Sequence, residues 1–166
     1  MAEPPAVPGD IVAFLTDYVA AYGSGSLEAL RSFYTDGTLI WANQRHTVHG
    51  WPEVRAMFAP SFERFAIAAR VHLQEVRALG DERFIRFLTE VQLTPHAGGA
   101  VATAAFRDFA VLRRDGARWT IHRNIDQPIT PEQLAGDLAR DPPLAVIGGV
   151  ADPSAATGAS RADAAR

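Results

Sequence analysis

Charged side chains that could transfer protons or bind a polar ligand occur at alternate positions of a segment with the pattern of a β-strand. Between residues 84 and 93 the odd-numbered positions are almost wholly apolar, whereas the even-numbered positions include Arg86 and Glu90. Successive side chains of a strand point to opposite faces, so one face is apolar and the other is mixed. Asp108 and Arg123 lie on later strand-like segments. An arginine can bind an anionic or carbonyl group, and a carboxyl group can act as an acid or a base.

Aromatic and histidine side chains form a second set of candidates. Several aromatic residues could line a wall against a flat ligand, although aromatic residues on helices more often belong to the core: Trp41, Trp51, Phe58 and Phe62. Among the five histidines, only His46 and His49 lie close together, where they could bind a metal or shuttle protons. A third ligand and a tetrahedral pattern are lacking, so we expect no metal site and no cofactor. The sequence has no nucleophile elbow, phosphate-binding loop or dinucleotide-binding motif.

The composition excludes several classes of function. The 166 residues contain no cysteine, which rules out disulfides, thiolate catalysis and cysteine-bound metals. The net charge of -3 comes without a basic stripe, so no nucleic-acid partner is expected. No apolar run is long enough to span a bilayer, and the first ten residues lack the basic start and apolar core of a signal peptide. We therefore expect a cytoplasmic protein with no membrane partner.

Helical periodicity precedes strand periodicity along the chain. We expect Asp10 to cap the first helix and Pro60 to bend or break the third. The predicted elements are helices from about 10 to 22, from Ser26 and after Gly50, strands at 38–43, 69–79, 82–94, 100–113 and 118–126, and a capped helix starting at Thr130. Helices followed by an antiparallel meander indicate a segregated α+β fold. We expect a flexible leader at 1–9, one domain at 10–148 and a disordered tail at 149–166.

Four stretches occur in a characteristic order and at ordinary spacing: YVAAY at 18–22 before a Gly/Ser loop, FYTDGTL at 33–39, HGWPEV at 49–54 and RDGARWTI at 114–121. Together they resemble the nuclear transport factor 2-like (NTF2-like) superfamily, especially its SnoaL-like polyketide cyclase and ketosteroid isomerase-like branches. The resemblance covers residues 10–127. It implies a cone in which three N-terminal helices pack on the concave face of a curved antiparallel sheet, with a short C-terminal helix and a central small-molecule pocket.

The match to the isomerase branch is partial. Tyr18 falls where that branch has its oxyanion-hole tyrosine, and Asp108 falls where it keeps a protonated aspartic acid. Such a pair would donate hydrogen bonds to a developing enolate. The carboxylate base of the branch should lie at Trp41 or Ala42, and neither side chain can accept a proton.

The resemblance also implies which faces of the strands line the pocket. The even-numbered set at 84–93 would face it, beside Tyr18, Asp108 and Arg123, which are the candidate catalytic residues. The candidate ligand contacts are Arg86, Glu90, Trp41, Asn43, Phe58, Phe62, Phe106 and Ile125. The apolar odd-numbered set, with Phe109 and Val111 on the next strand, would form the convex face and bind the second subunit of a homodimer.

Two classes of function are open. The first is a cofactor-free isomerase, cyclase or dehydratase that uses acid–base chemistry on an apolar or carbonyl-bearing molecule. The second is a non-catalytic ligand-binding or dimerisation module that has lost the base. The charged residues could instead form a structural arginine–carboxylate network. If Arg123 pairs with Asp108, the aspartate is ionised, whereas an Asp108 far from Arg123 can hold a proton and donate it in a hydrogen bond.

Overall fold

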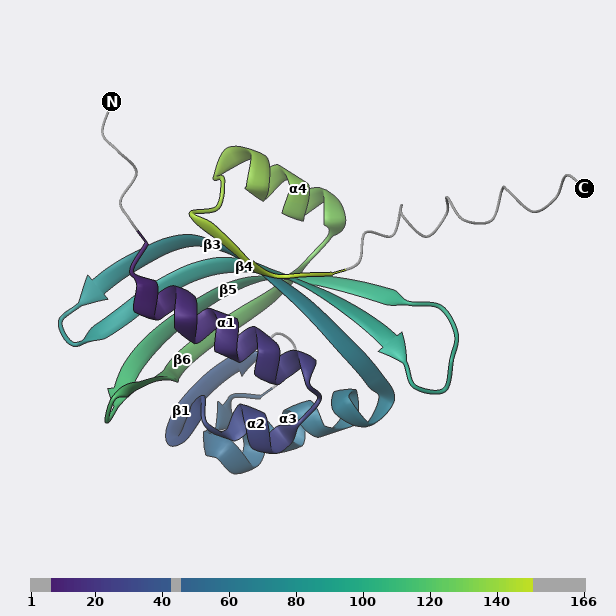
Figure 1. Cartoon of the computed structure of the whole chain (residues 1–166), viewed down its shortest axis with the longest axis horizontal. Coiled ribbons are helices and arrows are strands. Elements are labelled where there is room, and N and C mark those ends of the chain that lie inside the picture. The colour runs from purple at the N-terminus through teal and green to yellow at the C-terminus, as the bar shows by residue number, and fades with distance from the viewer. Residues whose placement is uncertain (1–6, 43–45, 151–166) are drawn as a thin grey trace, which may run out of the picture.

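A seven-stranded curved sheet forms the centre of the protein, which we describe from a computed structural model for residues 7–42 and 46–150. The strand order is β2-β1-β6-β5-β4-β3-β7 (Figure 1). The strands are β1 Tyr34–Ala42, β2 Val48–His49, β3 Phe65–Leu79, β4 Glu82–Pro95, β5 Ala102–Asp115, β6 Arg118–Ile129 and β7 Ala145–Gly148. The helices are α1 Gly9–Gly23, α2 Leu27–Arg31, α3 Gly50–Arg64 and α4 Pro131–Arg140. The fold is α+β, as predicted, but the sheet is mixed, because β1 and β6 run parallel.

The helices divide between the two faces of the sheet. Helices α1, α2 and α3 lie on one side, which we call the inner face, and α4 lies on the other side, the outer face (Figure 1). The main core fills the space under α1–α3 and includes the fully buried Ile11, Leu73 and Leu112. A small second cluster joins Leu134 of α4 to Leu88 of the sheet.

Local sequence signals explain most helix ends. The Ser26 hydroxyl accepts a hydrogen bond from the backbone N–H of Ala29, and Thr130 forms a reciprocal capping box with Gln133. Two predictions were wrong. Asp10 does not cap α1, because its carboxylate accepts hydrogen bonds from the side chains of Trp119 and Arg114. Helix α3 continues through Pro60 to Arg64, with apolar packing on both sides of the proline.

Strand β7 was not predicted from the sequence. Its four residues pair antiparallel with β3, where Val71 lies opposite Ile147. So short a strand has too few residues to show a period of two. It adds an edge to the sheet after α4, and the Arg70 side chain donates a hydrogen bond to the Val150 carbonyl beyond it.

Two β-bulges decide which side chains face the helices. On β3, Leu73 and Glu75 lie opposite the consecutive residues Phe87 and Arg86, so that Gln74 is the extra residue. On β6, Ile121 and Arg123 lie opposite the consecutive residues Leu112 and Val111, which makes His122 the extra residue. An extra residue shifts the alternation of a strand by one position. Beyond His122, the even-numbered residues of β6 therefore face the helices.

Candidate functional site

A cavity of about 300 Å³, the central cavity, lies between the inner face of the sheet and the helices. Its lining combines aromatic rings of α1, β1 and α3 with polar groups of β4, β5 and β6. The residues that line it include Tyr18, Tyr22, Tyr34, Phe58, Thr89, Phe106, Asp108, Asn124 and Asp126. A mostly apolar cavity with a few convergent polar groups is the usual form of a small-molecule site.

Asp108 is the most buried charged residue of the central cavity, with 7% of its surface exposed. Its Oδ2 accepts a hydrogen bond of 2.7 Å from the Thr89 hydroxyl on the neighbouring strand β4. Burial raises the pKa of the Asp108 carboxyl from 3.8 to about 7, the Thr89 hydrogen bond lowers it, and the nearby Asp126 raises it. A carboxyl group with this pKa can both hold and release a proton near neutrality.

Three tyrosines stand close to Asp108. The hydroxyl oxygens of Tyr18 and Tyr34 are 2.8 Å apart, so one hydroxyl donates a hydrogen bond to the other and the second keeps its own proton for another acceptor. Burial raises the pKa of Tyr18 and of Tyr34 well above 10, and that of Tyr22 to about 12. All three therefore remain neutral hydrogen-bond donors at physiological pH.

A second carboxyl group shares the central cavity with Asp108. Asp126 lies directly opposite Asp108 in the antiparallel β5–β6 pair, and both line the cavity. Across the parallel β1–β6 pair, Asp126 is the partner of Ala42, one of the two positions where a base was expected. Directly opposite side chains of two strands are within reach of each other, so the two carboxyl groups form one site.

The structure brings together some of the predicted site residues. Tyr18, Asp108, Phe58 and Phe106 line the central cavity. Arg123 does not, because the bulge at His122 turns it to the outer face, where its guanidinium donates to the carbonyl oxygens of Gly37 and His122. The prediction that Arg123 meets Asp108 was therefore wrong.

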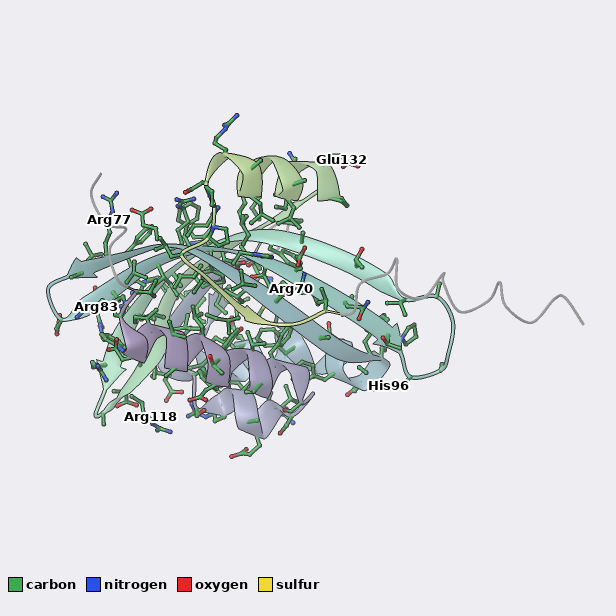
Figure 2. All side chains as sticks on the ribbon, turned by 45° about the horizontal axis from the view of Figure 1, so that its top comes forward. Arg70, Arg77, Arg83, His96, Arg118 and Glu132 are labelled. Carbon is green, nitrogen blue, oxygen red and sulfur yellow. The ribbon has the colours of Figure 1, made fainter. Side chains whose placement is uncertain are left out.

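Arg86 and Glu90 were also placed on the wrong face. The apolar odd-numbered residues of β4 face the helices, as Ile85 and Phe87 do, and this leaves the even-numbered residues outside. Arg86 forms ion pairs with Glu75 and Asp141, and Glu90 contacts Arg70 and His72. Figure 2 shows Arg70 where β7 runs along β3. On the outer face, the alternative of a structural arginine–carboxylate network is the correct one.

The other candidate ligand contacts have different outcomes. Trp41 and Ile125 are exposed on the outer face and do not line the cavity. The residues on either side of each in the sequence line the cavity, and neighbouring side chains of a strand point to opposite faces. Phe62 is buried behind the lining, where its ring contacts those of Tyr22 and Phe58. Asn43 lies outside the described residues.

Several lining residues with polar groups were missed by the sequence analysis, among them Tyr22, Tyr34, Thr89, Asn124 and Asp126. Tyr22 shares the apolar stripe of Tyr18, so helical spacing could have placed it in the cavity. Thr89 belongs to the odd-numbered set that was assigned to the convex face. Asn124 and Asp126 had the appearance of strand-end residues, and only the bulge at His122 shows that they point inward.

Comparison with known proteins identifies the family of this chain. A family model described as the SnoaL-like domain matches residues 11–124. The chain belongs to the SnoaL-like domain family. A search of curated proteins finds no match to this sequence. As a SnoaL-like protein with NTF2-like neighbours of known structure, the chain has the fold of the NTF2-like superfamily.

Three solved structures illustrate the similarity of this SnoaL-like chain. A ketosteroid isomerase-like protein from Erwinia carotovora atroseptica is 26% identical with a TM-score of 0.64, covering 74% of this chain and 96% of that chain. A candidate scytalone dehydratase from Novosphingobium aromaticivorans is 10% identical with a TM-score of 0.68, covering 74% and 83%. An NTF2-like superfamily protein from Salmonella enterica serovar Typhimurium is 13% identical with a TM-score of 0.61, covering 74% and 90%. The last two show the fold alone.

Two further observations concern the described part of the SnoaL-like chain. No helix in residues 7–42 and 46–150 is both long and apolar enough to cross a membrane. Within the same ranges, no three histidine, cysteine, aspartate or glutamate side chains are grouped so that they could hold a metal ion.

Proposed function

We propose that the central cavity binds a small, uncharged, oxygen-bearing molecule and transforms it by acid–base chemistry without a cofactor. The observation that carries this proposal is the buried carboxyl group of Asp108, which has a pKa of about 7 and lies among tyrosine hydroxyls. Buried charges are costly, so this carboxyl holds its proton over part of the physiological range. A neutral carboxylic acid inside an apolar cavity can donate a hydrogen bond that an ionised one cannot.

The hydrogen-bond geometry supports a role for Asp108 as a donor to the ligand. Thr89 donates to Oδ2 of Asp108, so Oδ1 is the oxygen that does not accept this hydrogen bond and can carry the proton. The hydroxyl groups of Tyr18 and Tyr34 carry two protons, and the hydrogen bond between them uses only one. The other proton can form a hydrogen bond with the ligand. Two donors aimed at one oxygen stabilise the negative charge that develops there when a neighbouring C–H bond breaks.

Two features favour an isomerase, cyclase or dehydratase-like reaction on a neutral molecule. The similar structure at 26% identity is a ketosteroid isomerase-like protein. In addition, two carboxyl groups line the cavity, and an anionic ligand placed beside them would meet Coulomb repulsion that is strong in a poorly solvated space. The ligand class is therefore an apolar molecule with a carbonyl or hydroxyl group.

A pair of probes tests the proposal. We expect 2-naphthol, which is flat and neutral with one hydroxyl, to bind in the cavity, and 2-naphthoate, which has similar shape but is anionic, to bind at least tenfold more weakly. Asp108→Ala should weaken 2-naphthol binding about tenfold, because the hydrogen bond from the Asp108 carboxyl group to the ligand oxygen is lost. Asp81→Asn, which changes an exposed carboxylate in the β3–β4 turn, should leave the affinity unchanged. Calorimetry that finds equal affinity for wild type and Asp108→Ala would contradict the proposal.

We also propose that the protein forms a homodimer through the outer face, on grounds that differ from the predicted ones. The apolar row at 85–93 lines the cavity and is not available to a partner. Instead, an apolar strip lies on the outer face, and it consists of the half-buried Phe84 and the exposed Phe109, Ile125 and Trp41. Phe109 lies opposite Ile125, which lies opposite Trp41, and the Phe84 and Phe109 rings are 5.9 Å apart. A continuous exposed apolar strip favours an interface.

A further inference from the structure

We infer that Asn124 is a specificity-determining residue of the central cavity, and that it selects ligands with a second hydrogen-bonding oxygen besides the one that Asp108 holds. The inference rests on the proposed function and narrows its ligand class from a neutral molecule with one oxygen to a neutral molecule with two. Asn124 lines the cavity and is half-buried. Within residues 7–42 and 46–150, its carboxamide has no hydrogen-bond partner.

The distance between Asn124 and Asp108 follows from the strand register. Asn124 lies two residues before Asp126, which is opposite Asp108 in the antiparallel β5–β6 pair. Diagonal neighbours on one face of such a pair are about 7–8 Å apart. Asn124 and Asp108 are therefore separate polar groups at two depths of one cavity, and each can bind a different oxygen of the same molecule.

Asn124 lies towards the more enclosed end of the cavity. Its cross-strand partners are Ala110 on β5, which is 3% exposed, and Ile40 on β1, which is 2% exposed. In the other direction along the strands, Phe106 is half-buried and Pro128 is exposed, and both line the cavity. A ligand oxygen that reaches Asn124 is therefore surrounded mainly by apolar side chains.

These apolar surroundings make the hydrogen bonds of Asn124 selective. A carboxamide has two N–H donors and a carbonyl acceptor, and a polar group that loses water without gaining a partner weakens the complex. A ligand with a hydroxyl or carbonyl oxygen beside Asn124 supplies that partner, whereas an apolar group of the same size does not. A site built to bind a ligand oxygen therefore rejects an analogue that lacks it.

The ligand that fits both polar groups is a flat, neutral molecule with an oxygen at each end. The carboxamide of Asn124 is uncharged and can pair with either a hydroxyl or a carbonyl group. The rings of Tyr22 and Phe58, which are 5.7 Å apart, provide apolar surface for the carbon skeleton between the two oxygens. Binding of the second oxygen by Asn124 fixes which part of the skeleton lies beside Asp108.

Two naphthols that differ in one group test the inference. 2,6-Dihydroxynaphthalene has a second hydroxyl at the far end of the ring system, and 6-methyl-2-naphthol has a methyl group of similar size in its place. At pH 6, where the Asp108 carboxyl holds its proton, we expect wild type to bind the dihydroxy compound about tenfold more tightly. Asn124→Leu has a side chain of similar size without hydrogen-bonding groups, and it should bind the two compounds equally or prefer the methyl compound.

Gln127→Leu is the matched control, because it replaces an exposed carboxamide on the same strand that does not line the cavity. This variant should keep the tenfold preference of wild type. Side-chain amide NMR provides a second readout, since the NH₂ signals that are missing in Asn124→Leu belong to Asn124. In wild type these signals should shift more with 2,6-dihydroxynaphthalene than with 6-methyl-2-naphthol.

The outcomes separate this inference from the proposed function. A wild-type protein that binds neither 2-naphthol nor its two derivatives contradicts both. A wild type that binds 2-naphthol but does not prefer the dihydroxy compound, or an Asn124→Leu variant that keeps the preference, overturns the role of Asn124 alone. Equal shifts of the Asn124 signals with the two compounds show that the second hydroxyl does not contact the carboxamide and also overturn it. Thermal unfolding of each variant confirms that the proteins compared are folded.

Discussion

A buried carboxyl group such as that of Asp108 destabilises the folded state whenever it is ionised. The cost is set by the difference between its pKa in the folded protein, about 7, and its ordinary value of 3.8. Each pKa unit corresponds to about 1.4 kcal/mol, so the ionised group lowers the free energy of unfolding by roughly 4 kcal/mol. Strongly shifted pKa values of this kind cluster at functional sites.

The sign of the pH effect follows from the raised pKa. Asp108 is uncharged in both states below pH 3.8, and the folded protein holds the additional proton between pH 3.8 and about 7. The stability that this proton confers is complete below pH 3.8 and is lost as the pH rises through 7. We expect Asp108→Asn to unfold at a temperature on the order of 10 °C higher than wild type at pH 8, with little difference at pH 4. Calorimetry at both pH values, with Asp81→Asn as control, measures the effect, and equal shifts at pH 4 and pH 8 would contradict it.

At the scale of residues, helical spacing was a better guide than strand alternation. The apolar stripe of the first helix placed Tyr18 in the interior without any structural information, and the resemblance placed Asp108. Arg123 and Asp126 exchanged faces because of one extra residue, His122. A bulge has no fixed sequence signature outside glycine-containing types, so the sequence could not show which of the two side chains points to the cavity.

At the scale of elements, the strands and helices with strong periodicity or cap signals were predictable. The β3–β4, β4–β5 and β5–β6 connections were marked by glycines, and α4 by its capping box. The parallel β1–β6 pair and strand β7 depend on contacts between segments far apart in the chain. Local sequence carries little information about such contacts, and they appear only when the chain is folded.

Gly148 at the end of β7 provides a test of how that strand is held. It has φ of +81°, and a Cβ atom there would meet the Ala69 carbonyl oxygen and Cγ1 of Val19 well inside van der Waals contact. We expect Gly148→Ala to lower the free energy of unfolding by about 1–3 kcal/mol and to increase amide exchange in β7. Gly149→Ala is the matched control, since a Cβ atom at Gly149 has no heavy atom within 4 Å. Equal stability of the two variants in urea unfolding would show that β7 does not pack as described.

At the scale of the whole molecule, the two faces of the sheet differ in the side chains that they carry. The inner face holds the central cavity, and the outer face carries paired arginines and carboxylates together with the apolar strip of Phe84, Phe109, Ile125 and Trp41. The last three of these residues are 39%, 47% and 43% exposed. In a monomer they would remain in contact with water, so burial against a second copy is favourable.

The dimer proposal can be tested by placing a charge on the strip. We expect wild type to sediment as a dimer at micromolar concentration, and Ile125→Asp to sediment as a monomer, because a carboxylate buried without a partner is costly. Val101→Asp changes an equally exposed residue outside the strip, in the loop before β5, and should leave the dimer intact. A wild-type protein that is monomeric across the range would refute the interface.

The bulge at His122 also has a consequence for how the protein can evolve. Residues 123–127 contain two alternative interiors, one with Asn124 and Asp126 and the other with Arg123 and Ile125. Because His122 is the extra residue, its deletion would keep Ile121 opposite Leu112 and Arg123 opposite Val111, and Asn124 and Asp126 would still face the cavity. Loss of the bulge at unchanged chain length would instead let the residues after Ile121 continue its alternation, so that Arg123 and Ile125 would turn inward. The cavity would then lose a carboxylate and gain a guanidinium, while the outer strip would lose an apolar member and gain an acid. Ligand charge and subunit association thus depend on the same bulge, and selection on either property acts on both.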